Sequence, residues 1–402
     1  MKCKGMSMLY VGVFLMICAT VIAVPVQDQN GIQKLARASN NFAMDLFQQL
    51  PKDENLFISP FSISTAMGMV YLGAREGTAR ELEATLGYQE EQLLDEEVHQ
   101  AFQSTLNQIE GSQDQYKLIA ANSMVNHIDY SVLDSYKTQL QEKYKAEIRE
   151  ADFVNEREKA TQEINEWVDQ KTQHKIAKLF EEPLSSDTIL VLLNAVYFKG
   201  TWLYKFNSSN TLSGTFYNKG TDGKDILFMH LTHKFNFTEV ADLQARMIEL
   251  PYKGKDISMF AILPYQRNGL AVLESQLNPD KITKIIGQMR ETRVSVDLPK
   301  FDLTYEKELS PFLQSLGLTK LFKSGQSDLS GISSKNDLSV SKIKHKAVIE
   351  VNEEGSEAAA ATGVLVFGTS LGPTFYADHP FLFIIRDNIS GMILFLGRVN
   401  EF

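Results

Sequence analysis

Both cysteines of this chain, Cys3 and Cys18, lie within its first 23 residues. This segment has the pattern of a secretory signal peptide, which is removed from the mature protein. The mature chain, residues 24–402, then has neither a disulfide nor a thiol. Secreted proteins with small cores depend on disulfides, so a chain without them needs a large hydrophobic core. With 44% hydrophobic residues, this chain can form one.

The N-terminal pattern distinguishes a signal peptide from a membrane anchor. Lys2 and Lys4 precede an uncharged apolar run that starts at Met8 and reaches a small residue at Ala23. A spanning helix needs roughly 20 apolar residues, and the polar residues after Pro25 end the run before that length. We therefore expect residues 1–23 to be cleaved and the protein to be secreted and extracellular.

The charge of the chain argues against several classes of partner. Its formal net charge is -10, and removal of Lys2 and Lys4 makes it -12, because no Asp or Glu precedes residue 24. A protein this acidic is repelled by phosphate backbones and by anionic membrane surfaces. We expect no nucleic acid, heparin or membrane partner.

Three sequences fit the N-x-S/T acceptor pattern for N-linked glycans. They begin at Asn207, Asn236 and Asn388. A secretory route makes exposed acceptors usable, so we predict a glycoprotein.

The mature chain contains no Pro-rich or Gly/Ser-rich linker, no repeat and no low-complexity tract. This continuity favours one large domain. Helical periodicity dominates the first half and apolar, β-rich runs dominate the second, an order that predicts an α+β fold. The predicted strands are 188–198, 247–251, 257–263, 294–298, 381–385 and 392–399, and the last two form a hairpin around a polar turn.

Two helices are predicted in detail. Thr78 and Glu81 have the spacing of a capping box, which would open a helix that ends at Gly87. Apolar residues from Ile164 to Leu179 recur at helical spacing, with charged residues between them, and predict one long amphipathic helix.

One enzyme motif is present. Residues 368–372 read G-T-S-L-G, the G-x-S-x-G pattern of a hydrolase nucleophile at Ser370. That nucleophile must lie between a strand and a helix, with its Asp and His far downstream. Here Pro373 follows without a helical pattern, and only 30 residues remain after Gly372. His230 and His233 belong to no zinc motif. We expect no catalytic residue, no metal and no cofactor.

Residues 353–379 combine conflicting local preferences. The segment starts with helix-forming residues, and Gly363 and a β-rich stretch follow. Glu357 lies in one register, whereas the alternate positions are small or apolar, namely Ser356, Ala358, Ala360, Thr362, Val364 and Val366. This alternation is typical of a strand that can enter a sheet with one face against the core.

Several blocks of the chain resemble the serpin family. Residues 194–202 (N-A-V-Y-F-K-G-T-W) are similar to the family's N-x-x-x-F-K-G-x-W strand, and residues 353–360 (E-E-G-S-E-A-A-A) to its inhibitory hinge. Residues 375–381 (F-Y-A-D-H-P-F) resemble the block after the reactive loop, in the wording of arthropod members. Residues 59–62 (S-P-F-S) and 345–347 (H-K-A) are similar to two further motifs. The resemblance covers essentially the whole mature chain.

The resemblance implies a single serpin domain, residues 24–402, with three β-sheets, about nine helices and an exposed reactive loop at about 353–378. In such proteins a serine protease cleaves the loop and forms an acyl-enzyme, and the cut loop then inserts into the main sheet. It implies a monomeric inhibitor that forms a covalent complex with an extracellular serine protease. A carrier or storage protein with the same fold but no inhibitory activity is the alternative.

The resemblance also assigns roles to residues. Spacing within the family places the cleaved bond between Thr369 and Ser370, with Phe367 or Leu371 as the alternative reactive residues. The hinge comprises Glu353, Glu354, Gly355, Ser356, Glu357, Ala358, Ala359, Ala360 and Ala361. The polar cluster that governs opening of the main sheet comprises Ser59, Ser62, Asn194 and His345, and Trp202 lies where the loop first enters.

The loop composition indicates the class of target. No Lys or Arg occurs between Gly355 and His379, so a trypsin-like pocket would leave its buried carboxylate unpaired. Thr369 suits the small pocket of an elastase-like protease. Phe367 or Leu371 suits a chymotrypsin-like or subtilisin-like one.

Overall fold

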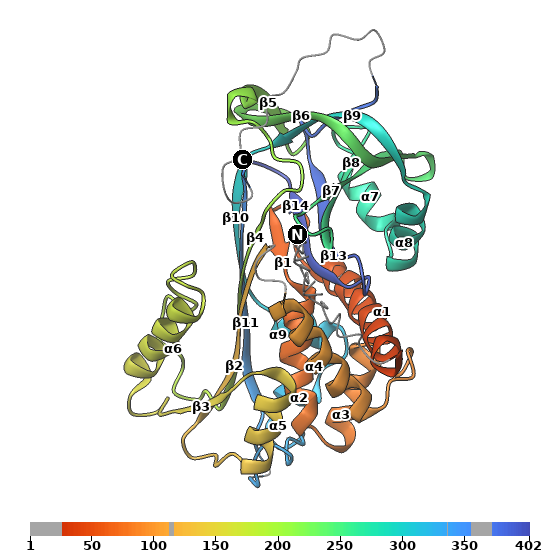
Figure 1. The fold of residues 1–402 in the computed structure, drawn as a ribbon. Coiled ribbons are helices and arrows are strands. Elements are labelled where there is room, and N and C mark those ends of the chain that lie inside the picture. Colours follow the sequence, from red (N-terminus) through yellow and green to blue (C-terminus); the bar gives the residue numbers. More distant parts are fainter. Residues whose placement is uncertain (1–25, 112–115, 336, 355–371) are drawn as a thin grey trace, which may run out of the picture.

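The computed structural model describes residues 26–111, 116–335, 337–354 and 372–402. Helices α1 to α6 come before most of the strands, in agreement with the α+β prediction (Figure 1). The α-helices in these ranges are α1 (Val26–Gln49), α2 (Pro60–Gly73), α3 (Glu76–Thr85), α4 (Asp95–Gly111), α5 (Asp134–Tyr144), α6 (Arg157–Lys171), α7 (Leu270–Gln276), α8 (Pro279–Gln288) and α9 (Ser310–Ser315). Short 3-10 helices are η1 (Ser208–Asn210), η2 (Ala241–Leu243) and η3 (Lys320–Phe322).

The strands of the described residues form two hydrogen-bonded sheets. In chain order they are β1 (Leu56–Ile58), β2 (Tyr116–His127), β3 (Ile148–Ala151), β4 (Leu190–Gly200), β5 (Leu212–Asn218), β6 (Asp222–Val240), β7 (Ala245–Pro251), β8 (Ile257–Pro264), β9 (Arg290–Pro299), β10 (Phe301–Glu308), β11 (Val340–Val351), β12 (Thr374–Tyr376), β13 (Phe381–Asp387) and β14 (Ile393–Val399). The six strands predicted from sequence all occur, each within a few residues of its predicted ends.

The larger sheet has nine strands. Eight follow the order β1-β14-β13-β8-β7-β6-β9-β12, and β5 pairs with β6 outside this path. Residues 228–237 of β6 pair with β9, whereas residues 237–240 pair with β7. Three sheets were predicted. The described strands form two, because the 19-residue β6 continues from one half of the larger sheet into the other.

The smaller sheet has the order β10-β11-β4-β2-β3. Helix α2 packs against the face of this sheet that is turned toward the main core, and every residue of α2 is buried. Its mean hydropathy is correspondingly high, because a helix enclosed on all sides has no polar face. Helix α6 lies on the opposite, outer face (Figure 1).

A second, small core joins α6 to the outer face. Ala160, Ile164, Trp167 and Val168 of α6 contribute to it, together with residues of β2 and β4. The helix was predicted to continue to Leu179, but it ends at Lys171, because the backbone turns left-handed at residues 173–174. The chain after α6 keeps its apolar residues in the same core without being helical.

No helix in the described part of the chain is both long and apolar enough to cross a membrane. The longest helix, α1, has 24 residues and a mixed sequence. The apolar residues Leu35, Phe42 and Leu46 of α1 are buried, and so is Leu50, which directly follows the helix.

Candidate functional site

The candidate site lies along the boundary between β4 and β11, two neighbouring parallel strands of the five-stranded sheet. We name this boundary the seam. The register of the two strands runs from Val340 opposite Leu190 to Ile349 opposite Phe198. Every other pair of this sheet except β2 and β3 is antiparallel. The hinge follows β11 directly, so a chain that reversed direction after β11 would run antiparallel to both β11 and β4.

Four polar residues predicted to form a cluster do lie together beneath this seam. Ser59, Ser62, Asn194 and His345 are each at most 1% exposed. The Asn194 side-chain amide donates to Ser62 Oγ at 2.8 Å, and the Ser62 N–H donates to Ser59 Oγ at 3.2 Å. Ser59 Oγ donates to the Leu394 carbonyl at 2.8 Å, which connects the cluster to β14.

His345 links the two strands of the seam. The Ser59 N–H donates to its Nε2 at 3.4 Å, so the ring proton lies on Nδ1 and is donated to Asn194 Oδ1 at 2.5 Å. Complete burial lowers the pKa of His345 to about 3, and the imidazole is therefore neutral at physiological pH. A neutral ring satisfies both contacts, whereas a protonated ring would place a second donor against the Ser59 N–H.

The sequence prediction missed one member of the cluster, Asn122 of β2. Its Oδ1 accepts from Ser62 Oγ at 3.0 Å and from the Asn194 amide at 2.8 Å. Asn122, Asn194 and His345 lie directly opposite one another on three neighbouring strands. Asn122 and Ser123 interrupt the apolar residues of this segment, but no motif singled out Asn122, and β2 itself was not predicted.

Trp202 lies at the end of the seam where β11 passes into the hinge, and its predicted role in loop entry stays a prediction. Its indole N–H donates to the Asn352 carbonyl at 2.9 Å. The ring stacks on Tyr252 at a centroid distance of 4.5 Å and packs edge-on against Phe206. The indole is 4% exposed, so it fixes the backbone where β11 passes into the hinge.

The first hinge residue is also anchored. Glu353 accepts from Thr211 Oγ1 at 2.8 Å and from Lys300 Nζ at 2.9 Å. Burial opposes ionisation of this carboxyl, but these bonds outweigh it and lower the pKa of Glu353. Glu354 is exposed, and its N–H donates to Asn352 Oδ1 at 3.2 Å.

The remaining loop positions fall outside the described residues. These are the hinge residues from Gly355 to Ala361, the predicted bond between Thr369 and Ser370, and the alternatives Phe367 and Leu371. The chain is described again from Gly372, where an added Cβ would lie 2.3 Å from the Arg293 carbonyl oxygen. This backbone approach requires glycine at that position.

The segment after the loop is held by β9. Strand β12 pairs in parallel with it, and the Ala377 N–H donates to the Asp297 carbonyl at 3.0 Å. His379 is 6% exposed, and its ring nitrogens contact Asp378 Oδ1 and the Pro264 carbonyl. His379 thus faces the protein interior, which does not favour a role as base for Ser370.

His230 and His233, considered above as metal ligands, lie on β6. His230 Nδ1 contacts Asp297 Oδ1 at 2.8 Å, and His233 stacks on Tyr204. Within the described residues no three His, Cys, Asp or Glu side chains gather in a group that could hold a metal ion.

The three predicted glycan acceptors differ in their environment. Asn207 is exposed and caps η1 through its Oδ1. Asn236 is also exposed, but its amide donates to Glu249 at 2.7 Å. The amide of Asn388 donates to the Lys255 carbonyl and to Ser258 Oγ. Glycosylation therefore stays a prediction at all three.

This chain is similar to known proteins in both sequence and fold. The family model described as serpin (serine protease inhibitor) matches residues 37–402. Intracellular coagulation inhibitor 1 of Tachypleus tridentatus is 43% identical over 92% of this chain and 90% of its own length. Iripin-8 of Ixodes ricinus is 42% identical (91% and 93%), and human Serpin B4 is 39% identical (92% and 100%).

Solved structures agree with these sequence relatives. Uncleaved ovalbumin matches with a TM-score of 0.85 and 31% identity, over 91% of this chain and 99% of the ovalbumin chain. A tumour-suppressing serpin matches with a TM-score of 0.83 and 27% identity, over 92% and 99%. Relatives from two arthropods are among the matches, as the wording of residues 375–381 suggested. The chain belongs to the serpin family.

Proposed function

We propose that this serpin is a secreted inhibitor that traps serine proteases as a suicide substrate. A target protease cleaves the reactive loop and remains attached as an acyl-enzyme. The cut loop then enters the five-stranded sheet between β4 and β11. Elastase-like or chymotrypsin-like enzymes are the expected targets, because the loop carries no Lys or Arg between Gly355 and His379.

The observation that carries this proposal is the parallel seam beside the hinge. A strand inserted after β11 runs antiparallel to both neighbours, and antiparallel pairing is slightly more stable per residue than the parallel pairing it replaces. About 15 inserted residues at roughly 3.3 Å each give about 50 Å of strand. That length carries an attached protease from one end of the sheet toward the other.

The relatives support inhibition as a class. Two of them are named coagulation inhibitors of Tachypleus tridentatus. Those names describe the relatives.

The first experiment incubates the mature protein with elastase, chymotrypsin and trypsin. A complex that survives denaturing electrophoresis is expected with elastase or chymotrypsin, and the released peptide should begin at Ser370. A peptide beginning at Gly368 or Gly372 would keep the mechanism and move the bond. Cleavage without a complex by every protease tried would favour the carrier or storage alternative.

A matched pair of loop variants tests insertion itself. Ala358 lies on the face of the loop expected to meet the core, and Glu357 lies on the opposite face. Ala358→Arg buries an unpaired charge on insertion, which costs several kcal/mol, so the protease should cleave this variant without being trapped. Glu357→Arg keeps the charge in solvent and should still form the complex. Equal complex yields from the two variants would contradict insertion.

Secretion is tested separately. Expression of residues 1–402 in insect cells should deliver the protein to the medium with Val24 as its first residue. Retention of full-length protein in the cells would contradict both the signal peptide and the extracellular location.

A further inference from the structure

The segment that follows α6 lies across the seam. We name residues 173–183 the strap. Ile176, Leu179 and Phe180 of the strap share the small outer core with Leu193 and Ala195 of β4. On the other side of the seam, Nζ of Lys346 on β11 donates to the Lys178 carbonyl at 2.8 Å. The strap is therefore bound to both strands between which the loop would enter.

Glu350 of β11 joins the strap and both strands at a single carboxylate. Its Oε1 accepts from Nζ of Lys175 in the strap at 2.8 Å and from Tyr197 Oη of β4 at 3.0 Å. Its Oε2 accepts from Lys199 Nζ of β4 at 3.3 Å. The ammonium of Lys175 also lies 5.0 Å from the centre of the Tyr197 ring. We name these four residues the clasp.

The electrostatics of the clasp favour an ionised carboxylate. Burial opposes ionisation of Glu350, but the hydrogen bonds from Lys175, Tyr197 and Lys199 outweigh it and lower its pKa. Asp302 lies opposite Glu350 on β10, and burial together with the charge of Glu350 raises the pKa of Asp302. Lys175 and Lys199 therefore interact with both carboxylates, and Asp302 remains near them when Glu350 is replaced.

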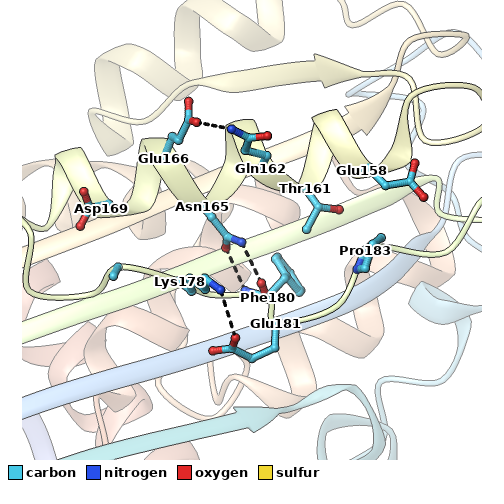
Figure 2. A pocket seen from close by; sticks show the side chains of 11 residues that line it. Glu158, Thr161, Gln162, Asn165, Glu166, Asp169, Lys178, Phe180, Glu181 and Pro183 are labelled. Atoms are coloured by element: carbon cyan, nitrogen blue, oxygen red, sulfur yellow. Dashed lines mark hydrogen bonds and ion pairs between the residues drawn. The ribbon is translucent and has the colours of Figure 1, made fainter.

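The strap is also tied to α6. The Asn165 side chain of α6 accepts from the Leu179 and Phe180 N–H groups and donates to the Phe180 carbonyl at 2.7 Å (Figure 2). A groove of about 410 Å³ lies between the polar face of the helix and residues 177–183 of the strap. The strap and α6 are thus linked at Asn165.

We infer that Glu350 is a positioning residue that restrains opening of the seam, by tying β11 to β4 and to the strap at the end where the loop enters. This inference rests on the proposed function. Neighbouring strands lie about 4.8 Å apart, and a strand inserted between them doubles that spacing. The bonds from Glu350 to Tyr197 and Lys199 cannot span the added distance, so they must break before the loop passes.

A protease-free assay tests the clasp. A synthetic peptide of residues 356–367 is mixed with the intact protein, and its uptake is followed by native electrophoresis and by the gain in thermal stability. Glu350→Gln should take up the peptide about tenfold faster than the wild type. The wild type must break charged, partly buried hydrogen bonds when the seam opens, and the variant lacks them. Lys175→Met removes the strap's bond to Glu350 and its contact with the Tyr197 ring, but it keeps the bonds between β11 and β4, so it should give a smaller acceleration.

The matched control is Glu306→Gln. Glu306 of β10 pairs with Lys344 and Lys346 of β11, and it is about as exposed as Glu350. The pairing of β10 with β11 does not open on insertion, so this variant should take up the peptide at the wild-type rate. Raising the salt concentration should accelerate uptake by the wild type more than by Glu350→Gln, because screening weakens the clasp.

The outcomes separate the clasp from the proposed function. If the wild type takes up no peptide and gains no stability, the sheet does not accept a strand and the proposed function fails. If the wild type takes up peptide but Glu350→Gln is no faster than Glu306→Gln, the inference about the clasp is overturned while the function stands.

Discussion

The β4/β11 seam and the C-terminal hairpin of β13 and β14 are both pairs of neighbouring strands, but different contacts hold them. The hairpin is antiparallel, and β8 and β1 cover its two edges. Phe395 of β14 stacks on Phe57 at 5.0 Å and packs against Phe198 at 5.1 Å. The seam is parallel. Its inner face, toward the main core, carries the polar cluster, and its outer face carries the clasp.

This difference indicates which part of the molecule can rearrange. Apolar packing stabilises the hairpin in proportion to the area removed from water, so this stabilisation is lost as soon as the side chains separate. Hydrogen bonds along the seam can instead be exchanged for new ones when a strand enters, since the net energy of each bond is small. We therefore expect the hairpin to stay fixed and the seam to be the place where the proposed insertion opens the sheet.

The largest expected effect on stability comes from a substitution that removes a buried contact of the hairpin. Arg398 of β14 and Glu274 of α7 form a fully buried ion pair, with Nε and Oε1 at 2.5 Å. Glu274→Ala leaves the Arg398 charge buried without a partner, so the free energy of unfolding should fall by about 3–5 kcal/mol. Urea unfolding followed by circular dichroism measures the loss.

Two controls sharpen that result. Glu401→Ala removes the partner of Lys219 in an exposed pair and should cost less than about 1 kcal/mol. Uptake of the loop peptide by Glu274→Ala should keep the wild-type rate, because the pair lies outside the seam. A comparable loss of stability in both variants, or faster uptake, would contradict the division between the two regions.

A pH titration tests the polar cluster of the seam. The pKa of His345 is about 3 in the folded protein and about 6.5 when unfolded, so only the unfolded chain gains this proton between those values. The contribution of the neutral His345 ring to the free energy of unfolding is complete above pH 6.5 and is lost as the pH falls toward 3. At pH 5 the loss is about 2 kcal/mol.

The variant His345→Gln isolates this contribution. A glutamine can donate to Asn194 and accept from the Ser59 N–H without titrating. The difference in unfolding free energy between pH 7 and pH 5 should therefore shrink by about 2 kcal/mol relative to the wild type. An unchanged pH dependence would mean that His345 does not control stability in this range.

The sequence predicted those parts that depend on local pattern. The hairpin was predicted because a polar turn separates two apolar runs, and the family resemblance supplied Ser59, Ser62, Asn194 and His345. Local pattern failed for the predicted capping box. The hydroxyl of Thr78 accepts from the Asp328 N–H, and Glu81 accepts from the Thr319 and Lys320 N–H groups. Both side chains bind a distant loop instead of the start of α3.

The clasp could not be predicted from the sequence either, because its contacts also join distant segments of the chain. Lys175 and Glu350 are 175 positions apart, and neither residue belongs to a motif. Their meeting depends on α6 ending at Lys171 and on the strap folding back over the sheet. Asn122 is similar, because its role comes from the register of three strands. Contacts set by register and by chain reversal are not encoded in a local pattern.

A charge reversal at the hinge has a smaller expected effect. Glu353→Lys replaces the bonds to Thr211 and Lys300 with repulsion from Lys300, which is 42% exposed. We expect a loss of about 1–2 kcal/mol, together with faster uptake of the loop peptide. The double variant Glu353→Lys with Lys300→Glu should recover most of both. Failure of the second change to restore either property would show that the pair does not hold the hinge.

The smallest effect is expected at Trp202, beside the end of the seam where β11 passes into the hinge. Trp202→Phe keeps an aromatic ring against Tyr252 and removes only the bond from the indole N–H to the Asn352 carbonyl. One neutral hydrogen bond contributes about 1 kcal/mol, so urea unfolding should show a loss of that size. If the bond restrains the seam, peptide uptake also becomes a few-fold faster. A loss of stability without faster uptake would assign Trp202 to the fixed part of the molecule, with the hairpin.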